Sequence, residues 1–243
     1  MTGLIGQLAE QMPVALEEVT VAGRVGLVIV DEVNGFATVG AGNLAPPKPN
    51  EQVSRMVAET NSLAHEFLDR GGPVLAFLDT HEPGKLEPPY PLHCERGTGE
   101  EELVREIAWL ADADGVTLVR KDCINGFVGA IDVDSGANRI VDWVNAHVLE
   151  TVVVVGICTD ICVMDFVLTF LSARNHGLMP SLTEVIVHEP ACATYDLPRA
   201  AVAELGLPVS ASHPQRLTHH MGLYFMHSRG ARLAGGVSWS GAQ

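Results

Sequence analysis

The sequence has few basic side chains for its length. Among its 243 residues, 15 are Lys or Arg and 30 are Asp or Glu, which gives a formal net charge of -15 at pH 7. Such a charge repels nucleic-acid phosphates and anionic lipid surfaces, so we expect neither as a partner. The start lacks a basic segment followed by an apolar stretch, and no later apolar run approaches the roughly 20 residues that a membrane helix needs. These absences predict a cytoplasmic protein.

The sequence also lacks the cysteine pattern of a secreted protein. Its five cysteines are an odd number, and their spacing fits neither a disulfide scaffold nor a redox or zinc-knuckle motif. We therefore expect reduced thiols. No G-x-S-x-G motif is present, so nothing indicates a serine hydrolase.

Short β-branched runs alternate with amphipathic stretches along the chain. Buried strands are predicted at 25–30, 74–78, 116–119, 152–155 and 184–187, and helices at 51–70, 101–110, 137–148, 160–174, 198–205 and 217–229. This alternation is typical of an α/β fold in which helices cover both faces of a parallel sheet, giving three layers. We expect one domain over residues 1–243, with 208–243 as a C-terminal extension packed on it.

Polar residues follow four of these strands. They are Asp31, the pair Asp79 and His81, Lys121, and the segment 159–162. Carboxyl ends of parallel strands meet at one edge of the sheet, where open α/β folds bind ligands, so these side chains should converge. Two long loops, 31–50 and 80–99, leave from the same edge. The alternative is that strand ends are simply where a chain becomes polar.

Cys162 lies where a strand gives way to a helix, whose start we expect Thr159 to cap. A helix N-terminus favours negative charge and lowers a thiol pKa, which predicts a nucleophile, and the free N–H groups of that turn can bind an oxyanion. The alternative is a small buried cysteine that packs the sheet, which describes Cys158 better. Asp31 is a candidate general base for the thiol. Lys121 would keep that carboxylate ionised, unless it forms only a surface salt bridge.

Asp79, His81 and His93 form a candidate metal site. One carboxylate and two imidazoles suit zinc, iron or manganese, although a D-x-H pattern is also frequent in surface turns. Glu82 and Glu87 lie on the same loop and are possible additional ligands. The histidines near the C-terminus, His213, His219, His220 and His227, show no ligand pattern, and we expect them to be solvent or packing residues.

Five segments together resemble the nicotinamidase branch of the isochorismatase-like cysteine hydrolases. They are VIVDEVNGF at 28–36, DTH at 79–81, YPLHC at 90–94, RKD at 120–122 and VGICTDICV at 155–163. Two further segments, AGNLAP at 41–46 and ACAT at 191–194, are similar to the plant-type members in particular. The matching segments run in the order of the family from about residue 25 to 195.

The resemblance implies a parallel sheet of about six strands, a cis peptide before Cys158 and a triad of Asp31, Lys121 and Cys162. It also implies an oxyanion hole formed by the N–H groups of Cys158 and Cys162, and a divalent metal, with zinc favoured, on Asp79, His81 and His93. Phe36 and Tyr90 would contact the substrate ring. Many relatives have Trp at the position of Tyr90 and a polar residue at that of Gly35.

The implied function is hydrolysis of nicotinamide to nicotinate and ammonia through a cysteine thioester, in NAD salvage. Self-association is also typical of the family. The alternatives are another amidase of the superfamily, acting on a ureido acid, maleamate or a different aromatic amide, and a catalytically silent binding module of the same fold. A vinyl-ether hydrolase is disfavoured because that reaction does not use a thiol nucleophile.

Overall fold

Residues 3–240 are described by the structure, a computed structural model. Seven strands form one sheet in the order β1-β7-β6-β5-β2-β3-β4, and every ladder between neighbours is parallel. The strands are β1 (Glu17–Val21), β2 (Val25–Val30), β3 (Val74–Asp79), β4 (Val116–Lys121), β5 (Thr151–Ile157), β6 (Glu184–Ala193) and β7 (Arg232–Trp239). The predicted α/β class is confirmed.

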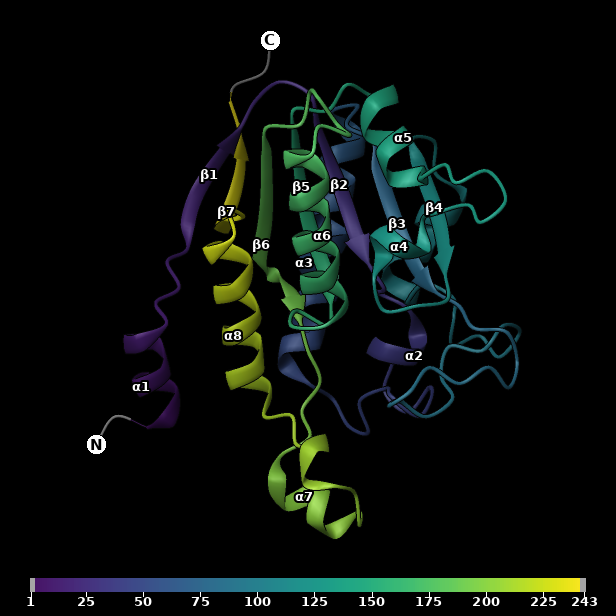
Figure 1. The fold of residues 1–243 in the computed structure, drawn as a ribbon, viewed down its shortest axis with the longest axis vertical. Helices are drawn as coiled ribbons and strands as arrows, with labels where there is room; N and C mark the ends of the chain where they lie inside the picture. Colours follow the sequence, from purple (N-terminus) through teal and green to yellow (C-terminus); the bar gives the residue numbers. More distant parts are fainter. Residues whose placement is uncertain (1–2, 241–243) are drawn as a thin grey trace.

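Helices cover both faces of the sheet (Figure 1). One face carries α3 (Glu51–Asp69), and the other carries α4 (Gly126–Gly129), α5 (Arg139–Ala146), α6 (Cys162–Asn175) and α8 (Gln215–Ser228). The remaining helices are α1 (Leu4–Gln11), α2 (Asn34–Ala37) and α7 (Arg199–Glu204), with 3-10 segments η1 (Arg105–Asp112) and η2 (Val209–Ala211). Every residue of β2, β3 and β5 is buried, which accounts for their continuous apolar sequences.

Helix α3 shows how local sequence sets an element. The Asn50 side chain accepts a hydrogen bond from the Val53 N–H at 3.2 Å, as an N-cap does. One face of the helix is apolar and buried, with Met56, Ala64 and Phe67 fully inaccessible. The helix stops before Gly71, whose φ of +74° suits the left-handed conformation that follows a helix end.

The sheet has seven strands, in line with the expected number of about six, because β1 and β7 extend one side of it. Strand β7 comes from the segment 208–243. Two details differ from the sequence-based expectations. The predicted helix at 101–110 is instead the 3-10 segment η1. Thr159 does not cap α6, because its hydroxyl pairs with the His219 ring. The division of the chain into domains stays a prediction.

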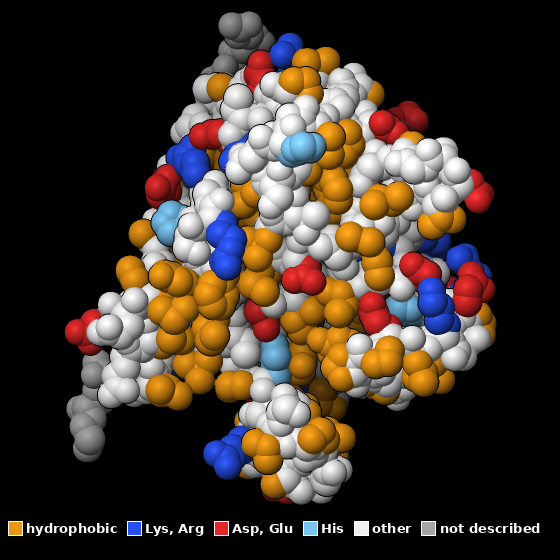
Figure 2. Space-filling model, in the orientation of Figure 1, with side chains coloured by type: hydrophobic (Ala, Val, Ile, Leu, Met, Phe, Trp, Pro, Cys, Tyr) orange, Lys and Arg blue, Asp and Glu red, His pale blue; other side chains and the backbone are white. Residues whose placement is uncertain are grey.

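The carboxyl ends of β2, β3 and β4 lie at the lower edge of the sheet in Figure 1, where the long loops and α7 also lie. Figure 2 shows hydrophobic side chains exposed in the region above the protruding α7 segment. Within residues 3–240, no helix is both long and apolar enough to cross a membrane.

Candidate active site

Three buried charged residues meet at the carboxyl edge of the sheet. Asp79 and Lys121 are the last residues of β3 and β4 and are direct partners in the parallel ladder. Lys121 Nζ donates to Asp79 Oδ1 at 3.0 Å and lies 2.8 Å from Asp31 Oδ2. Asp31 follows β2 with a φ of +54°, a conformation that non-glycine residues rarely adopt. The predicted convergence of Asp31, Asp79 and Lys121 is therefore present.

Burial and the neighbouring charges set the protonation of this group. Burial raises the pKa of Asp31 to about 7, against the opposing charge of Lys121. Although burial opposes it, the two carboxylates hold the pKa of Lys121 well above its ordinary value. Burial would also raise the pKa of Asp79, but Lys121 and the His81 and His93 rings hold it well below the usual range. The site thus contains a fixed ammonium beside a carboxyl that exchanges its proton near neutral pH.

Cys162 begins α6, and only 8% of its surface is exposed. Within the described part of the chain, no acceptor pairs with the backbone N–H of Cys158 or of Cys162. The peptide bond between Ile157 and Cys158 is cis, as the resemblance implies. The expected lowering of the thiol pKa is wrong for this structure. Burial, with an addition from Asp31, raises the pKa of Cys162 well above its ordinary value despite Lys121.

Asp79, His81 and His93 form a group in which one ligand atom of each lies within 4.8 Å of the others. The Nε2 atoms of His81 and His93 are 3.1 and 3.2 Å from Asp79 Oδ2. His93 Nδ1 donates to the Pro91 carbonyl at 2.7 Å, which leaves the Nε2 lone pair directed at the group. All three side chains are buried, so the alternative of a solvated surface turn does not describe them. A buried group of one carboxylate and two imidazoles suits a divalent metal.

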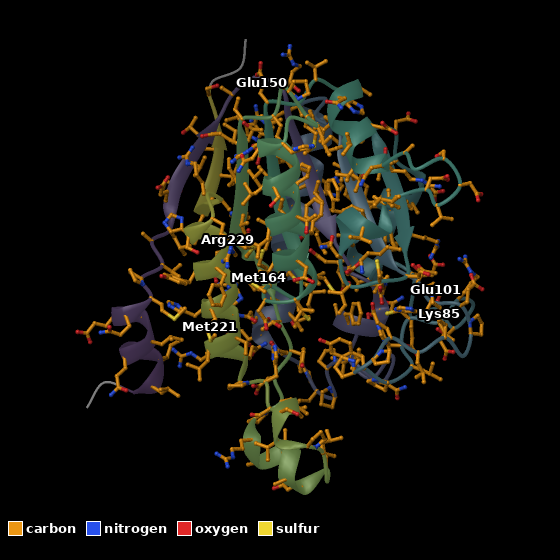
Figure 3. All side chains as sticks on the ribbon, viewed as in Figure 1. Lys85, Glu101, Glu150, Met164, Met221 and Arg229 are labelled. Carbon is orange, nitrogen blue, oxygen red and sulfur yellow. The ribbon has the colours of Figure 1, made fainter. Side chains whose placement is uncertain are left out.

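The loop after β3 brings His93 to this group. His81 forms an isolated bridge with Glu95, and its N–H donates to the Cys94 carbonyl at 3.0 Å. Farther along the loop, the Glu101 carboxylate accepts from the N–H of Gly99 at 2.8 Å. Figure 3 labels Glu101 and Lys85 on the side of the molecule where these loops lie. The loop is thus fixed at both of its ends.

The two possible additional ligands have different surroundings. Glu87 Oε2 lies 3.7 Å from His81 Nε2 and 3.8 Å from His93 Nε2, and Glu87 Oε1 accepts from the Ile124 N–H at 2.8 Å. Glu82 instead pairs with Arg96 at the surface. Glu87 is therefore the carboxylate that faces the candidate metal site.

A largely apolar cavity opens beside these groups. Cys162, Asp79, His93 and Glu87 contribute to its wall, as do the two residues named as ring contacts, Phe36 and Tyr90. The Phe36 and Tyr90 rings lie 5.6 and 6.2 Å from the His93 ring. The cavity therefore combines apolar walls with the Cys162 residue and two of the candidate metal ligands, Asp79 and His93.

Cys158, the predicted oxyanion-hole residue, also lines the cavity. The rest of the wall was not predicted from the sequence and consists of Leu44, Ile124, Ile157, Ile161 and Tyr195. Leu44 lies inside the AGNLAP segment, and Tyr195 directly follows ACAT. Both segments carry the plant-type resemblance. The location of Leu44 and Tyr195 in or next to these segments is therefore the sequence signal that could have identified them.

The model of the isochorismatase domain matches residues 25–206, which include every one of these site residues. The chain belongs to the isochorismatase family. It is 52% identical to Nicotinamidase 1 from Arabidopsis thaliana over 239 residues, which cover 97% of each chain. As a family member, it has the hydrolase fold on which the nicotinamidases are built.

Solved structures agree on the fold. The nicotinamidase PncA from Bacillus subtilis superposes with a TM-score of 0.63 at 21% identity, over 87% of this chain and 99% of the other. The pyrazinamidase of Pyrococcus horikoshii, solved in complex with zinc, gives 0.62 at 18% identity, over 87% and 98% of the two chains. At these identities the likeness establishes the isochorismatase-like architecture alone.

Proposed function

We propose that this protein is a nicotinamidase that hydrolyses nicotinamide to nicotinate and ammonia. The observation that carries the proposal is the position of Lys121 Nζ, 2.8 Å from Asp31 and 3.0 Å from Asp79, beside a cavity that contains the Cys162 thiol. This arrangement links a nucleophile with its base to a candidate metal site. The 52% identity to a nicotinamidase over nearly the whole chain supports the same substrate.

In the proposed reaction, Asp31 and Cys162 act together. Because burial keeps the thiol protonated at rest, the thiolate forms as Asp31, with its pKa of about 7, accepts the proton. The sulfur then attacks the carboxamide carbon, and the N–H groups of Cys158 and Cys162 bind the resulting oxyanion. Lys121 holds Asp31 in place and stabilises its ionised form.

Collapse of the tetrahedral intermediate breaks the carbon–nitrogen bond. Asp31 returns its proton to the leaving nitrogen, ammonia departs, and the acyl group stays on Cys162 as a thioester. Asp31 next takes a proton from an attacking water, so that the thioester carbon gains a hydroxyl. The carbon–sulfur bond then breaks, and Asp31 returns this proton to the sulfur, which regenerates the thiol. The acid leaves as nicotinate after losing its carboxyl proton to solvent.

Zinc is the metal that we propose for Asp79, His81 and His93, with iron or manganese as alternatives. When bound, such an ion would act as a Lewis acid toward the pyridine nitrogen of the substrate and toward water. Phe36 and Tyr90 are the proposed contacts to the pyridine ring, because both line the cavity near His93.

A panel of small amides tests the proposal, with nicotinamide first and released ammonia as the signal, before and after chelation. We expect nicotinamide to be the best substrate and chelation to remove the activity. Cys162→Ala should release no ammonia, whereas Cys192→Ala, a change at another buried cysteine that does not line the cavity, should remain active. Wild-type turnover by the Cys162→Ala variant would contradict the proposal.

A further inference from the structure

The turn from Cys158 to Cys162 holds the parts that the proposed chemistry needs in a fixed arrangement. It carries the thiol and both N–H groups of the proposed oxyanion hole. Its backbone is secured by the Thr159 N–H, which donates to Ala193 at 2.8 Å, and by the Val163 N–H, which donates to Cys158 at 3.1 Å. Since α6 has no side-chain cap, further restraint on the turn comes from the side chains of Thr159 and Asp160.

His213 holds Asp160 from the C-terminal part of the chain. Its Nε2 lies 2.8 Å from Asp160 Oδ2, and its Nδ1 donates to the Tyr195 carbonyl at 2.9 Å. The other carboxylate oxygen of Asp160 accepts from Thr194 at 2.7 Å. Burial would raise the pKa of Asp160, but these bonds and the charge of His213 keep it below the ordinary value. Asp160 is therefore an ionised side chain whose two oxygens both have partners.

The same imidazole supports the cavity wall. The His213 and Tyr195 rings stack with centroids 3.8 Å apart and an interplanar angle of 13°, and Tyr195 lines the cavity beside Cys158 and Cys162. One side chain thus contacts both the nucleophile turn and a wall of the cavity. His213 lies outside the matched family segment of 25–206.

Helix α8 braces the neighbouring residue of the turn in a similar way. His219 Nε2 lies 3.1 Å from Glu189 Oε1, which leaves Nδ1 to accept from the Thr159 hydroxyl at 2.8 Å. The helix backbone also approaches the turn closely, because a Cβ at Gly222 would lie 2.7 Å from Asp160 Cα. The position of the turn therefore depends on the segment that follows residue 208.

We infer that His213 is a positioning residue, which through Asp160 holds the Cys158–Cys162 turn in the geometry that the reaction requires. The inference rests on the proposed function, because it assigns the thiol and the two N–H groups their roles. His213 does not line the cavity itself and acts only through Asp160 and Tyr195.

Two substitutions separate the hydrogen bonds of His213 from its stacking. His213→Phe keeps a ring over Tyr195 but removes both donors, whereas His213→Gln removes the ring but keeps a donor for Asp160. The backbone bonds between residues 213 and 197, at 2.7 and 2.8 Å, are unaffected in both variants. His220→Gln is the matched control, because His220 lies on α8 but bonds the Met12 carbonyl.

A displacement of a reacting group by 1 Å costs on the order of 100-fold in rate, so we expect kcat of His213→Phe with nicotinamide to fall about 10- to 100-fold. KM should change little, because the cavity wall keeps its ring. His213→Gln should recover most of the lost kcat, and His220→Gln should match the wild type. Amide hydrogen exchange in the peptide 158–163 should be faster in His213→Phe than in the other proteins.

The inference is overturned if His213→Phe keeps the wild-type kcat, if its loss lies wholly in KM, or if His220→Gln loses as much. Equal exchange rates in residues 158–163 of all four proteins would also overturn it. The exchange measurement needs no substrate, so it separates the two proposals. Exchange could be faster in His213→Phe while the wild-type protein does not hydrolyse nicotinamide. That result would refute the proposed function, but it would still show that His213 holds the Cys158–Cys162 turn in place.

Discussion

Replacing Lys121 by Met leaves two buried carboxylates without their shared cation. Asp31 is fully buried and Asp79 is 1% exposed, and Lys121 Nζ lies 2.8 and 3.0 Å from their oxygens. Removing one partner of a buried ion pair costs about 3–5 kcal/mol. For a chain of this size 1 kcal/mol shifts Tm by about 2–4 °C, so we expect Lys121→Met to lower Tm by about 6–20 °C.

The pH dependence of this loss follows from Asp31. Its folded pKa, about 7, lies above the unfolded value of 3.8, so its stabilising contribution is complete at low pH and disappears as the pH rises towards 7. Without Lys121 the folded pKa of Asp31 rises further. The variant therefore continues to lose stability through Asp31 above pH 7, where the Asp31 contribution of the wild type is already lost. The deficit of Lys121→Met should therefore grow between about pH 7 and about pH 9.

The assay is thermal or urea unfolding after chelation, so that no metal compensates for the missing charge. Lys85→Met is the matched control, because Lys85 pairs with Asp122 through side chains that are about half exposed. Such a surface pair is worth about 1 kcal/mol or less. A Lys121→Met protein that melts with the wild type, or whose deficit shrinks as the pH rises from 7, would refute the reasoning.

Three further changes give separate tests. Burial raises the pKa of Glu32 from 4.5 to about 8, so wild-type stability should fall from pH 4.5 towards 8. Glu32→Gln should remove this part of the fall in the free energy of unfolding with pH, as measured by urea titrations at several pH values. If the variant and the wild type show the same dependence on pH, Glu32 is not protonated in the folded protein. Gly222→Ala should lower both Tm and kcat, because the new Cβ would lie 2.7 Å from Asp160 Cα; unchanged melting and turnover would exclude the close approach. His81→Ala should lose the bound metal by elemental analysis while the protein stays folded, and full metal content would rule out His81 as a ligand.

Much of the sheet was predictable because β2, β3 and β5 are buried on both faces and therefore have continuous apolar sequences. The convergence of Asp31, Asp79 and Lys121 was predictable for a related reason, since each stands where a strand of the parallel sheet ends. His93 came from the resemblance and from its residue type. The position of His93 depends on the bridge between His81 and Glu95, and no sequence pattern predicts that bridge.

Tertiary contacts decided what the sequence did not reveal. Thr159 has the residue type of an N-cap, but its hydroxyl bonds His219, which lies 60 residues away. His213 has no ligand pattern in the sequence, and only the fold brings it to Asp160. The direction of the thiol pKa shift was mispredicted because burial of Cys162 outweighs the helix terminus, and that burial is set by the fold.

The central claim is that Cys162 forms a covalent bond to the substrate, and it is tested most directly by rapid acid quenching during turnover of nicotinamide, followed by mass spectrometry of the digested protein. The account predicts that the peptide carrying Cys162 becomes heavier by one nicotinoyl group and that the adduct forms slowly or not at all in Asp31→Asn. Ammonia release at the wild-type rate with an unmodified Cys162 peptide at every quench time would contradict it.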